Sequence, residues 1–233
     1  MRKLTLFSLL LAVLFALLQP SHASASLSSG LPGGPVGTPV ISTQAYTVLA
    51  PARTALVVGD SITVRSYKAL AAQLSLHGQR LAVNAQSGRN TRLSVDALLA
   101  QMKGVPDSAW PSDLIMATGA NDVFAPGAML TQVPRLLAAV PKHVRVHWVT
   151  VYVARPAYLL ADKHNSYLVN QAITTGCAAS PRCSLVRWAA FLTASTPRLR
   201  ADIDTGGVHP TAAGRLDWGK LLASAVPAAP IGA

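Results

Sequence analysis

Short apolar runs alternate with helical patterns along most of this chain. Five runs have the length and composition of buried strands, at Ala55–Val58, Leu81–Asn84, Asp113–Thr118, Val144–Val151 and Ser184–Trp188. Helical spacing of apolar residues occurs between and after them, at about Arg65–His77, Leu93–Met102, Ala128–Val140, Asn165–Thr174 and Thr211–Ala225. This alternation predicts one doubly wound α/β domain, in which helices cover both faces of a parallel sheet of about five strands.

The two ends of the chain have a different composition. Residues 1–25 combine a basic start, an apolar run and small residues before the end, which indicates a secretory signal peptide. The apolar run is shorter than the ~20 residues of a membrane span, so cleavage is favoured over an uncleaved anchor. Residues 26–52 are rich in Ser, Gly and Pro without periodicity and are interpreted as a linker or arm, and residues 227–233 as a tail. We therefore expect a secreted or cell-envelope protein whose folded domain covers residues 53–226.

The charge of the chain limits its partners. Without Arg2 and Lys3, 18 of the 20 basic residues remain against 9 acidic ones, a net charge near +9. Such a charge favours anionic surfaces, and a cell-wall polymer is the partner that we retain. The basic residues are scattered and not interleaved with aromatic ones, so we expect no nucleic acid, and no later stretch is apolar for long enough to span a membrane. All nine acidic residues are aspartates, which excludes glutamate-dependent sites such as His-Glu-x-x-His zinc centres.

The two cysteines are close together in the sequence, at Cys177 and Cys183. In an exported chain this spacing predicts a local disulfide, which stabilises a tight loop by about 2 kcal/mol. A metal site would need further Cys or His residues nearby, and the sequence has none there.

Small polar residues follow the first three predicted strands. The blocks are Gly59-Asp60-Ser61, Ser87-Gly88-Arg89 and Gly119-Ala120-Asn121-Asp122, and a fourth block, Val208-His209-Pro210, precedes the last helix. Strand-to-helix junctions of a parallel sheet lie at one edge, where ligands bind. We therefore expect these four blocks to face one crevice.

The residue types in these blocks suit acyl transfer. Ser61 can act as a nucleophile if His209 takes its proton, and an oxyanion can be held by the backbone N–H groups of Ser61 and Gly88 and by the Asn121 amide. The competing interpretation is that Gly59-Asp60-Ser61 is an ordinary strand-to-helix junction, with Asp or Ser as the N-cap of the helix. Four such blocks at one edge favour the catalytic interpretation.

These blocks resemble the SGNH, or GDSL-type, serine hydrolases over roughly Ala55–Val226. The resemblance implies a flavodoxin-like three-layer α/β/α fold, no metal or other cofactor, and ester hydrolysis through an acyl-serine intermediate. It assigns Ser61 as nucleophile and His209 as base, and it assigns the oxyanion hole to Ser61, Gly88 and Asn121. The substrate would be a small-molecule or saccharide ester with an O-acetyl or short acyl group. The Ser87-Gly88-Arg89 block is similar to members that act on acetylated cell-wall glycans.

One position departs from the family pattern. The family usually has an aspartate three residues before the histidine, where this chain has Gly206. Asp204 can reach His209 if the glycine-containing segment between them loops out. Otherwise Asp202 or a backbone carbonyl orients the imidazole. We favour Asp204.

Two alternative functions remain open at this point. The same site could transfer its acyl group to a cell-wall glycan as an O-acetyltransferase, or a degenerate site could leave a non-enzymatic basic protein that binds the wall. The other notable residues have plainer interpretations. Arg89 is interpreted as a solvated side chain, with a substrate clamp beside Gly88 as the alternative, and Asp60 and Asp122 as ties between loops. The other histidines after the signal region are interpreted as surface or core residues, and the tryptophans as packing residues. These histidines are His77, His143, His147 and His164, and the tryptophans are Trp110, Trp148, Trp188 and Trp218.

Overall fold

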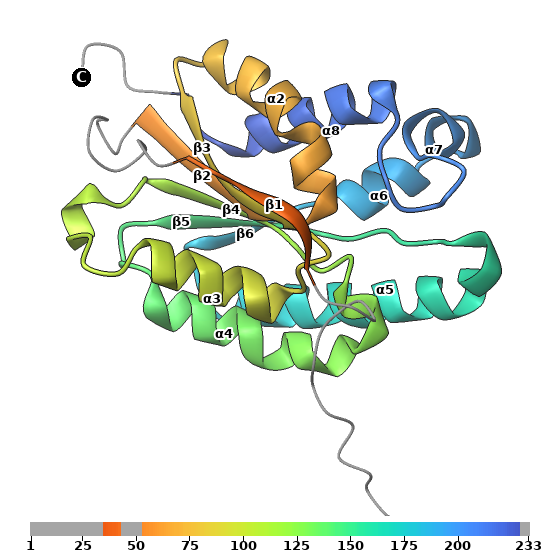
Figure 1. The fold of residues 1–233 in the computed structure, drawn as a ribbon, viewed down its shortest axis with the longest axis horizontal. Coiled ribbons are helices and arrows are strands. Elements are labelled where there is room, and N and C mark those ends of the chain that lie inside the picture. The colour runs from red at the N-terminus through yellow and green to blue at the C-terminus, as the bar shows by residue number, and fades with distance from the viewer. Residues whose placement is uncertain (1–34, 43–52, 229–233) are drawn as a thin grey trace, which may run out of the picture.

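The computed structural model describes residues 35–42 and 53–228, and the predicted signal peptide lies outside this part of the chain. Helices cover both faces of a central sheet, as the alternating sequence pattern predicts (Figure 1). Within the described residues the sheet has six strands in the order β1-β3-β2-β4-β5-β6. The strands are β1 (Val36–Ile41), β2 (Thr54–Gly59), β3 (Arg80–Ser87), β4 (Asp113–Ala117), β5 (Arg145–Val149) and β6 (Cys183–Val186).

The five predicted strands are β2 to β6, and they pair with one another in parallel. The sixth strand, β1, comes from the segment in which the sequence shows no strand periodicity. It pairs antiparallel with β3 at the edge of the sheet, and its register shifts between Val36 and Val40. Most of its residues are exposed, so no alternating buried face marks it in the sequence. The free backbone groups of β3 stabilise this strand, and they act only in the folded sheet.

The helices divide between the two faces of the sheet. They are α2 (Ser61–Ser75), α3 (Thr91–Gln101), α4 (Met129–Ala139), α5 (Leu159–Ala178), α6 (Trp188–Thr193), α7 (Thr196–Asp202) and α8 (Ala212–Ala225). Helices α3, α4 and α5 cover one face, and α2, α6 and α8 cover the other (Figure 1). The sequence predicts neither α6 nor α7, because both are too short for their spacing to be distinctive. Short 3-10 turns lie at Asp107–Ala109, Asp122–Phe124, Pro126–Ala128 and Pro156–Tyr158.

Each face of the sheet has its own hydrophobic core. Strand β2 lies in the middle, with all six of its residues buried, which explains its continuous apolar sequence. The four tryptophans are buried, as their interpretation as packing residues requires. Burial of one large side chain such as Leu70 or Leu74 of α2 stabilises the fold by about 2 kcal/mol.

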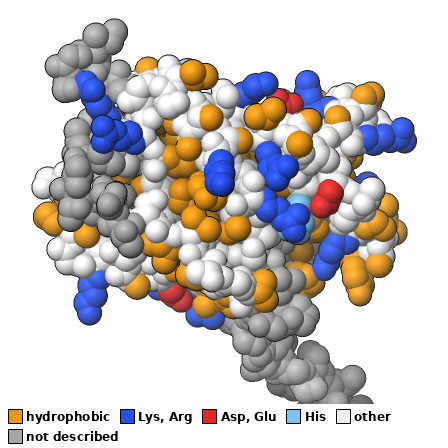
Figure 2. Space-filling model, turned by 45° about the horizontal axis from the view of Figure 1, so that its top comes forward, with side chains coloured by type: hydrophobic (Ala, Val, Ile, Leu, Met, Phe, Trp, Pro, Cys, Tyr) orange, Lys and Arg blue, Asp and Glu red, His pale blue; other side chains and the backbone are white. Residues whose placement is uncertain are grey.

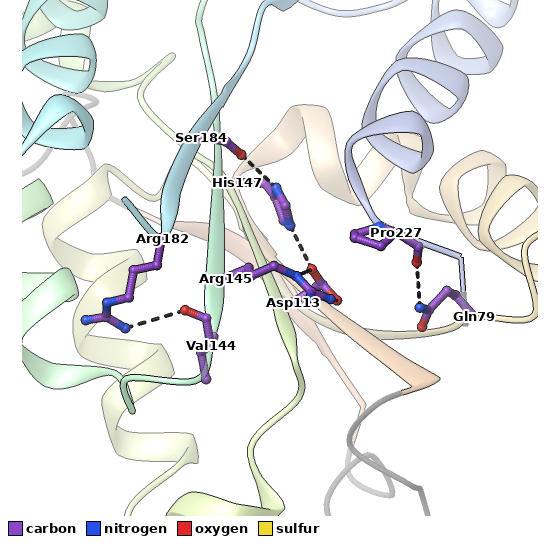
Figure 3. A network of polar contacts seen from close by, with 8 residues as sticks. All are labelled: Gln79, Asp113, Val144, Arg145, His147, Arg182, Ser184 and Pro227. Carbon is purple, nitrogen blue, oxygen red and sulfur yellow. Dashed lines mark hydrogen bonds and ion pairs between the residues drawn. The ribbon is translucent and has the colours of Figure 1, made fainter. Parts of the chain in front are cut away.

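A polar network joins the amino ends of three strands (Figure 3). Asp113 of β4 is fully buried, and its carboxylate accepts two hydrogen bonds from the guanidinium of Arg145 at 2.8 and 2.7 Å. The imidazole of His147 lies between Asp113 Oδ1 and the hydroxyl of Ser184 of β6, at 2.8 Å from each. Because the carboxylate is already neutralised by Arg145, we interpret this Ser-His-Asp set as a structural link between β4, β5 and β6.

The predicted disulfide between Cys177 and Cys183 is present, with an S–S distance of 2.07 Å. It joins the end of α5 to the start of β6. Among the described helices, none is long and apolar enough to cross a membrane.

Candidate active site

Ser61 is the first residue of α2, and a single residue, Asp60, separates it from the end of β2. Asp60 is the N-cap of this helix, and its Oδ1 accepts a hydrogen bond from Ile62 N at 3.0 Å. The competing interpretation of Gly59-Asp60-Ser61 is thus correct for Asp60, but it leaves the Ser61 hydroxyl free for another partner. The backbone N–H of Ser61 lies in the first turn, where helix N–H groups have no partner within the helix. Junction geometry therefore provides both a hydroxyl and an N–H donor.

The partner of the Ser61 hydroxyl is His209, from a loop 148 residues further along the chain. His209 Nε2 lies 3.0 Å from Ser61 Oγ. The loop ends where Thr211 caps α8, and Pro210 pairs with Ile203 in an isolated antiparallel bridge. Burial and the nearby positive charge of Arg65 lower the pKa of His209, while Asp204 opposes the shift. The imidazole is therefore neutral at pH 7 and can accept the serine proton.

Asp204 lies beside the other imidazole nitrogen, with its Oδ2 at 3.8 Å from His209 Nδ1. This distance allows an electrostatic interaction but exceeds that of a hydrogen bond. The other carboxylate oxygen, Oδ1, accepts from the backbone N–H groups of Val208 at 3.5 Å and His209 at 3.3 Å. Asp204 therefore holds the loop that carries the imidazole.

The loop between Asp204 and His209 turns at Gly207. Its N–H donates to Asp204 O at 2.9 Å, and its φ of +74° is one that other residues rarely adopt. A Cβ atom there would lie 2.6 Å from the carbonyl carbon of Ala154, so only glycine fits. Asp202, the alternative carboxylate, is buried at the end of α7, and within the described residues no hydrogen bond or ion pair joins it to His209. The geometry thus favours Asp204.

Gly88 and Asn121 line the same cavity as Ser61 and His209. Gly88 follows β3 with a φ of +77°, which explains a glycine at this turn. The Asn121 side-chain nitrogen donates one hydrogen bond to Arg89 O at 2.9 Å, which fixes the amide and leaves its second N–H available. All of the predicted oxyanion donors are therefore brought together at the carboxyl edge of the sheet.

Asp122 ties two of the junction loops together, as its sequence interpretation expects. Its Oδ2 accepts from Thr91 N at 2.9 Å and from Thr91 Oγ1 at 2.8 Å. Burial raises the pKa of Asp122 to about 6, although these hydrogen bonds oppose the shift. The carboxyl groups of Asp60 and Asp122 are thus used to shape the site.

The expectation that Arg89 is solvated is wrong. Its side chain is buried, and its Nη2 donates to Asn84 Oδ1 at 2.8 Å on β3. Arg89 directly follows Gly88 of the cavity lining, but its side chain contacts Asn84, and this polar partner offsets part of the cost of desolvating the guanidinium. Arg89 therefore does not line the cavity, although its backbone oxygen accepts the hydrogen bond from the Asn121 amide.

The cavity at the site has a volume of about 360 Å³. Its lining includes Ser87, Ala120 and Val208 of the predicted blocks. It also includes residues that the sequence interpretation missed: Val36, Arg65, Val123, Phe124, Val153 and Arg155. Arg65 was detectable, because it lies one helical turn after Ser61 and therefore on the same side of α2. Val36 was not, since it reaches the cavity through the pairing of β1 with β3.

A family model matches most of the chain. The match is to the GDSL-like Lipase/Acylhydrolase family and covers residues 57–215, which include Ser61, Gly88, Asn121 and His209. A search of curated protein sequences finds no significant match.

Several solved structures share the fold. The lipase/acylhydrolase from Enterococcus faecalis is 15% identical with a TM-score of 0.61, over 75% of this chain and 95% of that one. The C-terminal catalytic domain of Streptococcus pneumoniae peptidoglycan O-acetyltransferase A is 19% identical with a TM-score of 0.55, over 73% and 88%. A family 3 carbohydrate esterase from Clostridium thermocellum is 16% identical with a TM-score of 0.54, over 73% and 93%. At these identities the likeness establishes a shared fold.

Proposed function

This chain belongs to the GDSL-like lipase/acylhydrolase family, and we propose that it is an exported serine esterase that removes O-acetyl or other short acyl groups from saccharides. The observation that carries the proposal is the 3.0 Å approach of His209 Nε2 to Ser61 Oγ beside a cavity that also holds the oxyanion donors. A nucleophile, a base and N–H donors around one space are the parts that acyl transfer requires.

In the first half of the proposed reaction, Ser61 Oγ attacks the ester carbonyl carbon while His209 takes the hydroxyl proton. The carbonyl oxygen becomes an oxyanion, which the N–H groups of Ser61 and Gly88 and the Asn121 amide stabilise. When the intermediate collapses, the bond to the alcohol oxygen breaks and His209 returns its proton to that oxygen. The products of this half are the free alcohol and an acyl-serine.

In the second half, a water molecule takes the place of the alcohol. His209 removes a proton from this water, which attacks the acyl carbon and forms a second oxyanion in the same donor set. Collapse breaks the bond to Ser61 Oγ, and the serine regains its proton from the imidazolium. Asp204 stabilises the imidazolium in both halves through its negative charge at 3.8 Å.

The dimensions and surroundings of the cavity support a short acyl group. A volume of about 360 Å³ with apolar side chains such as Val123, Phe124 and Val153 suits a small acyl group but not a polymer. A saccharide chain would therefore remain at the mouth. The signal-like start and the net charge near +9 support an exported enzyme at an anionic cell wall.

The first experiment measures hydrolysis of 4-nitrophenyl acetate, butyrate and octanoate by the wild-type protein and by Ser61→Ala and His209→Ala. We expect both variants to lose about 10³-fold or more in kcat/KM and the acetate to be the preferred ester. Ser75→Ala and His164→Ala are matched controls, because both residues are exposed and lie outside the cavity. Equal activity of the wild type and Ser61→Ala would refute the proposal.

Labelling with a fluorophosphonate probe, followed by peptide mapping, tests the nucleophile directly. We expect the label on Ser61 alone. Adding a glycan acceptor then distinguishes hydrolysis from transfer, since an O-acetyltransferase would release acylated glycan in preference to free acetate. Absence of labelling together with salt-sensitive binding to wall material would support a wall-binding protein instead.

A further inference from the structure

Arg65 lies at the mouth of the active-site cavity. It follows Ser61 by one turn of α2, lines the same cavity and has an exposed side chain. Its positive charge helps to lower the pKa of the His209 imidazole. Arg65 is therefore close to the atoms that would react.

The other charged groups around the cavity already have partners. The guanidinium of Arg155 makes hydrogen bonds to both carboxylate oxygens of Asp162, at 2.8 and 2.6 Å, and lies over the ring of Phe124. Asp204 faces the imidazole of His209. Within the described residues no ion pair is formed by Arg65, so its charge at the cavity mouth is not neutralised by a carboxylate in contact with it.

The mechanism places the alcohol part of the substrate near this cation. The leaving oxygen receives its proton from His209 Nε2, so the alcohol lies beside the imidazole whose pKa Arg65 influences. With the acyl group inside a cavity of about 360 Å³, the rest of a saccharide chain extends through the mouth, where Arg65 is exposed. On the face shown in Figure 2, basic side chains lie beside a histidine, with an acidic side chain also next to it.

We propose that Arg65 selects esters whose alcohol part is anionic, so that the preferred substrates are acyl esters of acidic saccharides. This inference rests on the proposed esterase function and specifies the substrate class of that site. A carboxylate on the sugar would pair with the guanidinium while the acyl group enters the cavity. Because the alcohol leaves before water attacks, the preference acts on formation of the acyl-serine and appears in kcat/KM.

The test compares two substrates that differ only in charge, an O-acetylated methyl glucuronoside and the corresponding uronamide, with acetate release as the readout. We expect the wild type to favour the acid roughly fivefold to tenfold in kcat/KM, which is the size of a screened interaction between unit charges. Arg65→Gln should abolish this ratio, and Arg65→Lys should keep most of it. Lys68→Gln is the matched control, because it removes a charge from an exposed residue of α2 that does not line the cavity.

Salt provides a second readout. Raising the NaCl concentration to about 0.5 M should shrink the preference of the wild type and leave the ratio of Arg65→Gln unchanged, because ions screen an exposed charge pair. If Arg65→Gln lowers kcat/KM equally for both substrates, its role is not charge selection and the inference is wrong. Equal rates of the wild type on acid and amide would also overturn it.

The outcome remains distinguishable from failure of the proposed function. If that function is wrong, 4-nitrophenyl acetate hydrolysis will not depend on Ser61. If only the inference is wrong, hydrolysis will depend on Ser61 but show no charge preference. Should neither acetylated sugar be cleaved, the deacetylated acid and amide are compared as competitive inhibitors of 4-nitrophenyl acetate hydrolysis, and equal inhibition constants overturn the inference.

Discussion

The role of Asp204 can be tested by replacing it with asparagine. Asp204→Asn removes the negative charge 3.8 Å from His209 Nδ1 but keeps a side-chain oxygen. That oxygen can still accept from the backbone N–H groups of Val208 and His209. The substitution therefore separates the electrostatic role of Asp204 from its role in shaping the loop.

The expected loss follows from the distance and the exposure. Two unit charges 3.8 Å apart attract by about 4 kcal/mol at an effective dielectric constant of 20. The side chains of His209 and Asp204 are 25% and 35% exposed, so solvent screening reduces this to about 1–2 kcal/mol when the imidazolium forms. We expect Asp204→Asn to lower kcat/KM roughly fivefold to thirtyfold, far less than the loss of about 10³-fold or more for His209→Ala.

The pH profile provides an independent signature. Asp204 raises the pKa of His209, so its neutralisation lowers that pKa. The base acts when neutral, and the acidic limb of the kcat/KM profile should move to lower pH in Asp204→Asn. Arg65→Gln should move it in the opposite direction, because Arg65 lowers the pKa of His209.

The measurements are kcat/KM for 4-nitrophenyl acetate between about pH 5 and 9 for the wild type, Asp204→Asn, Asp204→Ala and His209→Ala. Asp204→Ala should lose more than Asp204→Asn, because it also removes the acceptor of the loop. A loss in Asp204→Asn as large as in His209→Ala would refute this reasoning, and so would an acidic limb that stays in place or moves to higher pH.

Three further predictions concern stability. Gly207→Ala should lower the free energy of unfolding by about 2 kcal/mol or more and impair activity, because the added Cβ collides with Ala154. Gly104 has a similar φ of +79° but open space around it, so Gly104→Ala should cost about 1 kcal/mol and leave activity unchanged. Urea unfolding and ester hydrolysis are measured for both variants. Asp113→Ala should lower the free energy of unfolding by about 3–5 kcal/mol at pH 7, because it removes the carboxylate that pairs with the buried imidazole of His147 and the guanidinium of Arg145. Burial raises the pKa of Asp113, but its hydrogen bonds outweigh this and lower the pKa below its ordinary value. The stability difference should therefore shrink as the pH falls from about 4 towards this lowered pKa, where the folded protein takes up the proton. A difference independent of pH would contradict the ion-pair explanation. Burial raises the pKa of Asp60 to about 7, so the folded state binds this proton more tightly and the wild type should lose stability as the pH rises from about 4 to about 7. Asp60→Asn keeps an N-cap acceptor but has no carboxyl group to titrate. Its free energy of unfolding, compared with that of the wild type, should therefore be higher at pH 8 than at pH 5 by on the order of 2 kcal/mol, as measured by urea unfolding at both pH values. No such gain would show that the carboxylate is stabilised by its surroundings.

The sheet and most of the helices were predictable from local patterns. The buried run at β2 and the alternation that follows it reflect periodicity and burial, which are properties of neighbouring residues. Strand β1 was not predictable, because its exposed residues have no buried periodicity and its stability depends on the free edge of β3. The early start of α5 at Leu159 was missed as well, since the helical spacing of apolar residues was apparent only from about residue 165.

By itself, the sequence determined the fold class and the four blocks that carry Ser61, Gly88, Asn121 and His209, because strand ends, caps and glycine turns are encoded by adjacent residues. Only the tertiary structure shows that Asp204 lies beside His209, because that position depends on how the loop at Gly207 packs against Ala154. It likewise decided the burial of Arg89 and the position of Arg65 at the cavity mouth. Desolvation and charge interactions act between residues that are distant in the chain, so they exist only once the fold has brought those residues together.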